Sequence, residues 1–411
     1  MTAPWPSFTE EEQEAVARVL ASGKVNYWTG GECRAFEREF ADWAGSDKAI
    51  ALANGTLALE VALKALEIGP GDEVVVTPRT FLASVSCVVN EGATPVFADV
   101  DPDSGNITPE TVRRVLTDRT RAIVPVHLAG WPCDMPGFQK LAEETGVKII
   151  EDCAQAHGAT IDGRNVGGFG DIGAWSFCQD KIITTGGEGG MVNTNDPDLW
   201  SRMWSFKDHG KSFEKMQPGD HPPGFRWVHD SFGSNYRMLE GQAVIGRIQL
   251  RRLSEWHRLR TQNARLLIEA IAQFPEAVRV PEPPAGLQHA YYRLYAYVRP
   301  DGLAAGWDRD RVIAELTARG VPAFHGSCSE VYLEKAFDGT GLRPADRLPV
   351  ARELGETSIA FLVHPTLTED DLAAMTSSIL AVFESASTAG GVSESGARGL
   401  RAGSNECRRR A

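Results

Sequence analysis

A single lysine, Lys181, lies inside the stretch SFCQDKIITTGGEGG, between a strand-like run and a glycine-rich turn. The glycines allow the backbone to approach another group closely. A lysine ε-amine that is partly removed from water can act as a nucleophile. Taken alone, an ordinary solvated lysine is the simpler interpretation, so other residues must decide whether this amine does chemistry.

An acidic residue, Asp152, ends the apolar run of the stretch IIEDCAQAHG. In doubly wound sheets, ligand sites open at the carboxyl ends of the strands. A carboxylate at such an end could pair with a cationic nitrogen of a ligand, and Gln155 could add a hydrogen bond at the same edge. A helix cap or a salt bridge is the alternative for Asp152, and His157 is interpreted as a structural residue.

A phosphate site is suggested by the stretch NGTLAL, where a strand ends at Asn54-Gly55-Thr56 and a helix begins. Such a junction offers free backbone N–H groups, the positive end of a helix and a hydroxyl group, all of which suit a phosphate. A tight turn followed by a helix cap explains the same residues without a ligand.

Three other motifs predict no site. GGFGDIG contains G-x-G-x-x-G starting at Gly168, but a dinucleotide fingerprint needs a strand before it and a helix after it, and here a loop precedes and a strand follows. HGKS at 209–212 lacks the first glycine of a P-loop. Cys153 and His157 are too few for a metal site, so we expect no metal.

The elements that must position these residues follow an α/β pattern. From about Lys48 to Thr194, short β-branched runs alternate with segments of helical spacing, and GAWSFC and GGMVNTN flank Lys181 as the last two strands. Repeated strand–helix units predict a mainly parallel sheet covered on both faces. Before them, TEEEQEAVARVLASG predicts a helix with a capping box of Thr9 and Glu12 that stops at Gly23.

The chain is predicted to divide into four parts. These are an N-terminal helix (1–25) packed with the small domain, a large cofactor-binding domain (26–250), a small C-terminal α/β domain (251–386) and a tail (387–411). The tail is predicted to be disordered because its residues are small and polar. Residues 207–233, rich in Gly, Pro and His, are predicted to form a long loop that is either functional or disordered.

The composition of the chain argues against some classes of binding partner. The 411 residues carry a net charge of −13, which argues against nucleic acid or an anionic membrane as the main partner. The first residues lack the apolar core of a signal peptide, and no run approaches a membrane span of about 18 apolar residues. The seven cysteines are scattered without a CxxC pair, so no disulfide framework is expected. Together these features predict a cytoplasmic protein.

Six stretches, taken together, resemble the DegT/DnrJ/EryC1/StrS family of sugar aminotransferases, which are fold-type I enzymes that use pyridoxal 5′-phosphate (PLP). They occur in the family's order across roughly residues 5–385: NGTLAL, TPRTFLAS, EDCAQAHGA, GDIGAWSF followed by Lys181 and TTGGEGG, KDHGK, and SNYRMLEGQAVIGRIQL. The resemblance implies a large domain with a mainly parallel central sheet and a smaller C-terminal α/β domain.

The resemblance also implies a role for each residue that would surround the ring of PLP. Lys181 would bind the cofactor covalently and then move the proton to and from the substrate carbon. Asp152 would pair with the pyridine nitrogen and keep it cationic, so that the ring can accept electrons. Phe81 would stack on the ring, and Gln155 would form a hydrogen bond near the ring hydroxyl.

The phosphate, by the same resemblance, would be held by Gly55, Thr56 and Ser176 of one subunit and by Asn235 of the other subunit of a homodimer with shared active sites.

On the substrate side, the resemblance points to three residues: His209, Arg237 and His325. This chain departs from the family pattern there. Ser234 stands where an aromatic residue often precedes the asparagine, the 207–233 loop is unusually long, and FHGSCSEVY replaces the usual pattern around His325. The acceptor therefore does not follow from the resemblance as directly as the cofactor does.

The implied reaction is the transfer of an amino group from L-glutamate or glutamine to a keto-sugar, most often a nucleotide-linked keto-hexose, in polysaccharide or secondary-metabolite sugar biosynthesis. A cyclitol (inosose) aminotransferase or an aminohydroxybenzoate-type synthase is the alternative. A sugar dehydratase is disfavoured, because relatives with that activity have histidine at the position of Lys181. A PLP-binding protein without turnover is a further rival, and no sequence feature favours it.

Overall fold

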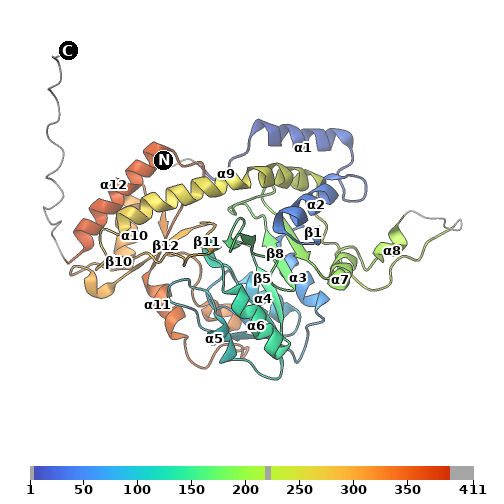
Figure 1. The fold of residues 1–411 in the computed structure, drawn as a ribbon, viewed down its shortest axis with the longest axis horizontal. Coiled ribbons are helices and arrows are strands. Elements are labelled where there is room, and N and C mark those ends of the chain that lie inside the picture. Colours follow the sequence, from blue (N-terminus) through green and yellow to red (C-terminus); the bar gives the residue numbers. More distant parts are fainter. Residues whose placement is uncertain (1–3, 218–223, 389–411) are drawn as a thin grey trace, which may run out of the picture.

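The computed structural model describes residues 4–217 and 224–388 (Figure 1). Its main element is a seven-stranded sheet in the order β1-β9-β8-β5-β4-β2-β3. The strands are β1 (Lys48–Leu52), β2 (Glu73–Val76), β3 (Thr94–Phe97), β4 (Thr120–Val124), β5 (Lys148–Asp152), β8 (Ile172–Ser176) and β9 (Gly190–Thr194). All pairs from β8 to β3 are parallel, whereas β9 is antiparallel to both β1 and β8. The predicted mainly parallel sheet is confirmed.

Both faces of this sheet are buried, which explains why its strands are continuous runs of mostly apolar residues rather than alternating apolar and polar ones. In β2, Val75 packs into the apolar core on one face, whereas Val74 and Val76 pack into the core on the other face. The helices that connect and cover the strands are α2 (Glu32–Ala44), α3 (Gly55–Ala65), α4 (Ala83–Asn90), α5 (Pro109–Arg113), α6 (Met135–Thr145) and α7 (Pro197–Lys207).

Helix α2 was not predicted, because the signal that starts it is distant in sequence. Its N-cap is Gly31, which has no side chain to cap the helix. The carboxylate of Glu240 instead accepts hydrogen bonds from the backbone N–H groups of Glu32 and Cys33. A negative group at the positive end of a helix stabilises the helix.

A second sheet has the order β10-β12-β14-β13 and is antiparallel throughout. Its strands are β10 (Val278–Arg279), β12 (Leu294–Val298), β13 (Ala323–Phe324) and β14 (Ser358–Phe361), and the helices near it are α10 (Arg309–Ala318), α11 (Pro349–Thr357) and α12 (Glu369–Ala386). This sheet has an apolar core of its own, formed with the second half of α9 (Glu240–Ile271). The two-residue strands β6 (Thr160–Ile161), β7 (Arg164–Asn165) and β11 (Leu287–Gln288) form a third, small sheet.

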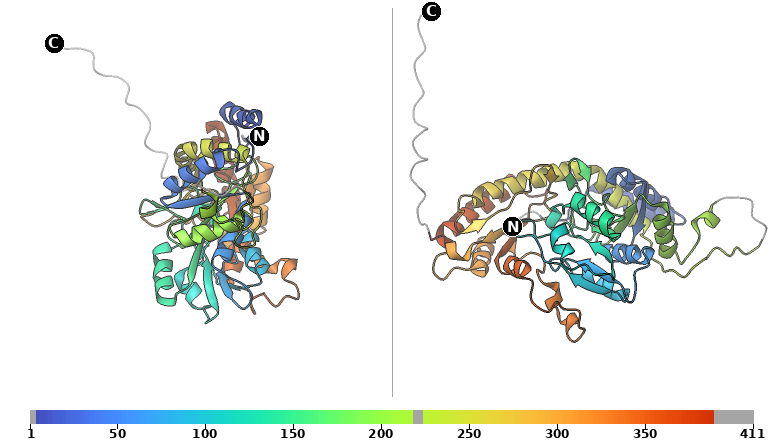
Figure 2. Two further views of the ribbon diagram at one scale, coloured as in Figure 1. Left: turned by 90° about the vertical axis from the view of Figure 1, so that its right-hand side faces the viewer. Right: turned by 60° about the horizontal axis from the view of Figure 1, so that its bottom comes forward.

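The long helix α9 runs across one side of the molecule and passes both larger sheets (Figures 1 and 2). Helix α1 (Glu10–Ser22) lies along its first half, where Gln249 donates to Glu12 at 2.8 Å. The capping box of Thr9 and Glu12 is present, and Gly23 ends α1 with a φ of 66°. These two predictions are confirmed, while the proposed domain boundaries stay a prediction.

Within the predicted 207–233 loop, residues 208–217 contain a short helix, α8 (Phe213–Met216), which lies away from the sheet (Figure 1). Residues 218–223 of this loop and 389–411 of the predicted tail lie outside the described residues. Within the described ranges, no helix is long and apolar enough to cross a membrane.

Candidate active site

A cavity of about 720 Å³ opens where the strands of the large sheet end. The loops that line it follow the carboxyl ends of β1, β2, β5 and β8, which is the edge where doubly wound sheets bind ligands. Seven residues singled out from the sequence line this cavity: Gly55, Thr56, Phe81, Asp152, Gln155, Ser176 and Lys181.

The start of helix α3 forms one wall of the cavity. The side chain of Asn54 caps the helix by accepting from the N–H of Leu57 at 3.0 Å, so the N–H groups of Gly55 and Thr56 have no acceptor within the helix. A Cβ atom on Gly55 would lie 2.6 Å from Cβ of Ser176, so only glycine lets this helix start against the end of β8. Two hydroxyls and two N–H groups therefore meet at a positive helix end, as a phosphate requires.

Asp152 is buried at the end of β5. Its Oδ2 accepts from the hydroxyl of Ser84 at 2.7 Å, and its Oδ1 accepts from the N–H of Ala154 at 3.1 Å. Burial raises the pKa of Asp152 above its ordinary value, and these two hydrogen bonds and the charge of Lys181 only partly oppose the rise. A cationic ring nitrogen in the cavity would favour the ionised carboxylate.

Phe81 and Gln155 present a flat apolar face and a donor to the same cavity. The side chain of Phe81 is 70% exposed, so Phe81 is not part of the core and offers a surface on which a planar ring can stack. The amide oxygen of Gln155 accepts from the N–H of Ala129 at 2.7 Å, which leaves its NH₂ group to donate to a ligand.

Lys181 lies in the loop between β8 and β9. Its N–H donates to the carbonyl of Cys178 at 3.1 Å, and its carbonyl accepts from the indole N–H of Trp5 at 3.0 Å. Its Nζ lies 4.8 Å from the centroid of the Tyr292 ring, which also lines the cavity. Sequence reasoning missed Trp5 and Tyr292, because neither belongs to a motif and both reach Lys181 only through the folded chain.

The other four predicted residues do not line this cavity. His209 and Asn235 are exposed and lie on two paired segments, since the N–H of His209 donates to the carbonyl of Ser234 at 2.9 Å. Arg237 lies nearby and forms an ion pair of 2.8 Å with buried Asp208. His325 is exposed and pairs with Asp310 at 3.1 Å.

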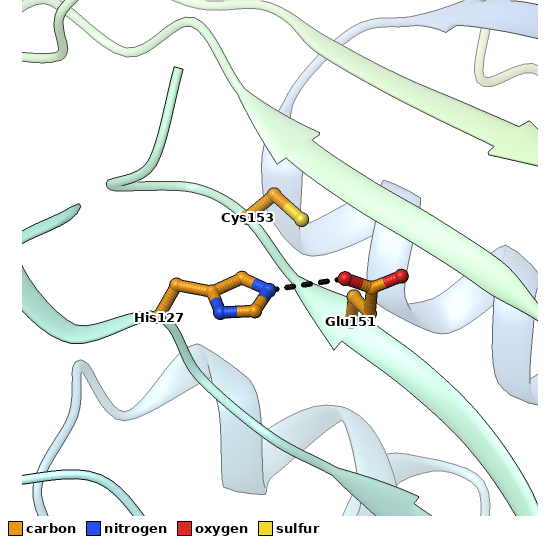
Figure 3. A group of neighbouring side chains, drawn as sticks. All are labelled: His127, Glu151 and Cys153. Atoms are coloured by element: carbon orange, nitrogen blue, oxygen red, sulfur yellow. Dashed lines mark hydrogen bonds and ion pairs between the residues drawn. The ribbon is translucent and has the colours of Figure 1, made fainter. Parts of the chain in front are cut away.

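A separate buried cluster of His127, Glu151 and Cys153 lies around the carboxyl end of β5 and does not line the cavity (Figure 3). His127 Nδ1 accepts from the N–H of Cys133 at 2.9 Å, so its Nε2 carries the proton that faces Glu151 at 3.2 Å. Glu151 also accepts three backbone N–H groups, at 2.6–2.7 Å, from the loop 167–170.

This cluster explains the glycine-rich stretch GGFGDIG. Its loop 167–170 folds around the Glu151 carboxylate, and the strand β8 follows it, as predicted. A Cβ atom on Gly173 would lie 2.4 Å from both Oδ1 of Asn193 and the carbonyl of Gly167, so close packing requires this glycine. The ring nitrogens of His127 and the oxygens of Glu151 are engaged in these hydrogen bonds.

The cavity as a whole fits PLP. A helix end with free N–H groups suits the phosphate, an exposed aromatic face suits the ring, and a buried carboxylate suits a cationic ring nitrogen. A lysine amine at the same cavity can bind an aldehyde covalently.

The chain was compared with known proteins. Residues 6–380 match the sequence model of the DegT/DnrJ/EryC1/StrS aminotransferase family. The chain is 37% identical over 349 residues to a UDP-N-acetyl-3-dehydro-alpha-D-glucosamine 3-aminotransferase of Acidithiobacillus ferrooxidans, which covers 85% of this chain and 88% of that protein. It is 36% identical over 319 residues to an L-glutamine:2-deoxy-scyllo-inosose aminotransferase of Streptomyces kanamyceticus, covering 76% of this chain and 74% of that protein.

The fold is also similar to solved structures. An aminotransferase from Psychrobacter cryohalolentis superposes with a TM-score of 0.92 at 61% sequence identity, covering 93% of this chain and 99% of that chain. The family match over residues 6–380 includes the cavity, both larger sheets and α9.

Proposed function

Because the chain belongs to the DegT/DnrJ/EryC1/StrS aminotransferase family, we propose that it moves an amino group from L-glutamate or L-glutamine to a keto-sugar at the cavity around Lys181. Family membership makes the protein an enzyme, an aminotransferase of fold type I, and PLP its cofactor. The observation that carries the proposed site is the meeting of seven predicted residues at one cavity.

PLP, when bound, supplies an electron sink for the bond changes at the amino-bearing carbon. In our proposal, Lys181 binds the cofactor covalently and, once released, carries the proton to and from that carbon. Asp152 holds the ring nitrogen cationic from a buried position. Phe81 and Gln155 fix the plane of the ring, while Gly55, Thr56 and Ser176 hold the phosphate.

A nucleotide-linked keto-hexose is the acceptor we propose first. Support comes from relatives named for UDP- and dTDP-linked sugars, at 37% and 34% identity, and from two named GDP-perosamine synthase. A cyclitol ketone is the second candidate, because two relatives at 36% identity are named for 2-deoxy-scyllo-inosose.

We propose further that the protein works as a homodimer and that Asn235 completes the phosphate site of the second subunit. Asn235 is exposed and does not line the cavity of its own chain. The neighbouring segment 224–232 exposes three large aromatic side chains: Phe225 at 78%, Trp227 at 83% and Phe232 at 100%. Exposed apolar groups of this size favour contact with another protein surface.

A test of the cofactor role uses absorbance and borohydride. The purified protein with PLP is expected to be yellow, to bleach when glutamate or glutamine is added, and to carry a borohydride-stable PLP adduct on the peptide containing Lys181. Lys181→Ala should lose adduct and turnover, whereas Lys148→Ala, which removes an exposed lysine of β5, should keep both. An adduct on a different lysine would overturn the assignment.

The acceptor is tested by offering keto-sugar nucleotides and 2-deoxy-scyllo-inosose in parallel and measuring amination by mass spectrometry. Amination of the cyclitol alone would replace our first choice by the second.

Shared sites are tested by mixing two inactive variants, Lys181→Ala and Asn235→Asp, the latter placing a charge where it would repel the phosphate. In a dimer with shared sites, mixed dimers restore one intact site each, so about a quarter of wild-type activity returns. If each site uses one chain only, mixing restores nothing.

A further inference from the structure

Tyr292 is a buried residue that precedes β12 and reaches the cavity from the part of the chain that forms the second sheet. Its ring lies 4.8 Å from Nζ of Lys181, measured to the ring centroid. An aromatic face at this distance attracts an ammonium group without accepting a strong, directional hydrogen bond from it. The ammonium form is therefore drawn to the cavity, where loss of a proton gives the amine that can react with an aldehyde.

The ring itself is held by two neighbours. The hydroxyl of Tyr292 donates to Oδ2 of Asp180, and Cζ of Arg293 lies 4.4 Å from the ring centroid. Arg293 also pairs with Asp180 at 3.4 Å. Burial, with the nearby charge of Asp180, raises the pKa of Tyr292, so its hydroxyl stays protonated and keeps donating to Asp180.

The two ends of Lys181 are therefore fixed by different parts of the chain. Its backbone is held by the carbonyl of Cys178 and by the indole of Trp5. Its amine lies over the ring of Tyr292, which comes from a segment 111 positions further along the chain (292 − 181). The backbone of Tyr292 is held in turn, because its N–H donates to the carbonyl of Ala129 at 2.9 Å.

We propose that Tyr292, anchored by Asp180, is a positioning residue that keeps the ε-amine of Lys181 in the cavity whenever that amine is not bonded to the cofactor. This inference rests on the proposed function. It predicts that the ring matters more than the hydroxyl, because the ring makes the contact and the hydroxyl only fixes the ring.

The test compares Tyr292→Leu, Tyr292→Phe and the control Tyr291→Leu, which changes the adjacent buried tyrosine that stacks on His289 instead. The first readout is the rate at which PLP attaches covalently to the PLP-free protein, followed by absorbance and borohydride trapping. The second is kcat and KM for the amino donor.

Tyr292→Leu should slow attachment and lower kcat by about tenfold with KM little changed, as expected for the loss of a cation–π contact. Tyr292→Phe should stay within about threefold of wild type, and Tyr291→Leu should match wild type in both readouts even if it unfolds at a lower temperature. Wild-type attachment by Tyr292→Leu would overturn the inference.

If Tyr292→Leu does not fold, Tyr292→Met carries the test, since a flexible apolar side chain can fill the same space but lacks the aromatic face that contacts Nζ of Lys181. Slower attachment would support the inference, and an unchanged rate would overturn it. Absence of a Lys181 adduct in the wild-type protein would instead contradict the proposed function, so the two failures are distinguishable.

Discussion

Two adjacent carboxylates on β5 give the sharpest prediction, because Glu151 and Asp152 are both buried and face different surroundings. Glu151 faces His127 and the loop 167–170, whereas Asp152 faces the cavity. We compare the isosteric amides Glu151→Gln and Asp152→Asn. We expect Glu151→Gln to lower stability with little effect on PLP binding, and Asp152→Asn to weaken PLP binding without lowering stability.

For Asp152, burial outweighs the favourable contacts, so the pKa in the folded, PLP-free protein is raised. Stability linked to this group is present below the unfolded pKa and is lost as pH rises through the folded pKa, at about 1.4 kcal/mol per pKa unit. Asparagine cannot ionise, so Asp152→Asn avoids the free-energy cost of burying a charged carboxylate at pH 7. Its oxygen can accept from Ala154 and its NH₂ can donate to Ser84, whose proton can turn to Thr80, 2.9 Å away.

The pKa of Glu151 shifts in the opposite direction to that of Asp152. Burial acts to raise the pKa of Glu151, but the hydrogen bond from His127 and those from the backbone N–H groups outweigh burial, so the pKa is lowered. The ionised group stabilises the fold above its unfolded pKa, and this stability is lost as pH falls through the folded pKa. Glutamine has one acceptor oxygen, so at least one buried N–H of the loop 167–170 loses its partner, at a cost of about 1–3 kcal/mol.

The assay is urea unfolding of the PLP-free variants at pH 7, followed by PLP titration. Asp152→Asn should be as stable as wild type or about 1 kcal/mol more stable, yet bind PLP about 10- to 100-fold more weakly, because a charge-assisted hydrogen bond is lost. Glu151→Gln should lose about 1–3 kcal/mol and bind PLP within about threefold of wild type. Equal losses of stability in both variants, or unchanged PLP affinity in Asp152→Asn, would refute the reasoning.

Three further predictions follow from single side chains. Phe81→Leu should weaken PLP binding by about tenfold, with little effect on unfolding, because the ring is exposed until a ligand covers it; a clear loss of stability without ligand would contradict this. Burial, with the charges of Lys181 and Arg260, lowers the pKa of His157 to about 3, so this group alone should cost about 2 kcal/mol of stability as pH falls from 7 to 5. His157→Phe should flatten that part of the pH–stability curve measured by urea unfolding, and an unaltered slope would refute the assignment. Glu240→Gln should destabilise the protein by about 1–2 kcal/mol in thermal or urea unfolding by weakening the cap of α2, and a neutral result would mean that the cap is not needed.

The strands of the large sheet were predictable because their signals are local. Each is a short apolar run bounded by turn residues. Strand β2 explains the run of apolar residues, because Val74, Val75 and Val76 are all buried, on alternating faces of the sheet. Helix α2 was not predictable from its own residues, because its cap is Glu240, 208 positions from Glu32. The strands β6, β7 and β11 are two residues long and exist only through pairing, so no periodicity could predict them.

The residues of the candidate site also divide into those that the sequence could place and those that it could not. Gly55, Asp152 and Lys181 each lie at or just after the carboxyl end of a predicted strand, so their shared edge followed from topology, and the family resemblance added their roles. Tyr292 could not be placed, because the sequence assigns its stretch AYYRLYAYV only to the small C-terminal α/β domain and gives no sign that one ring faces Lys181. His209 and Asn235 are exposed and Arg237 is partly buried beside Asp208, and the roles of all three stay predictions that a dimer experiment must decide.

The number of residues in α9 is more tightly constrained than the identity of its exposed residues. Its first residue, Glu240, caps α2 beside the large sheet, and Asn263 donates to the carbonyl of His364 at 3.0 Å near the second sheet. Inserting one residue between these positions would rotate the far half by about 100° and advance it by about 1.5 Å, breaking both sets of contacts at once. Natural variants and engineered chimeras should therefore accept many exchanges on the outer face of this helix but no single-residue gap. A seven-residue insertion would nearly restore the facing of the far half but advance it by about 10.5 Å, so it should not be tolerated either.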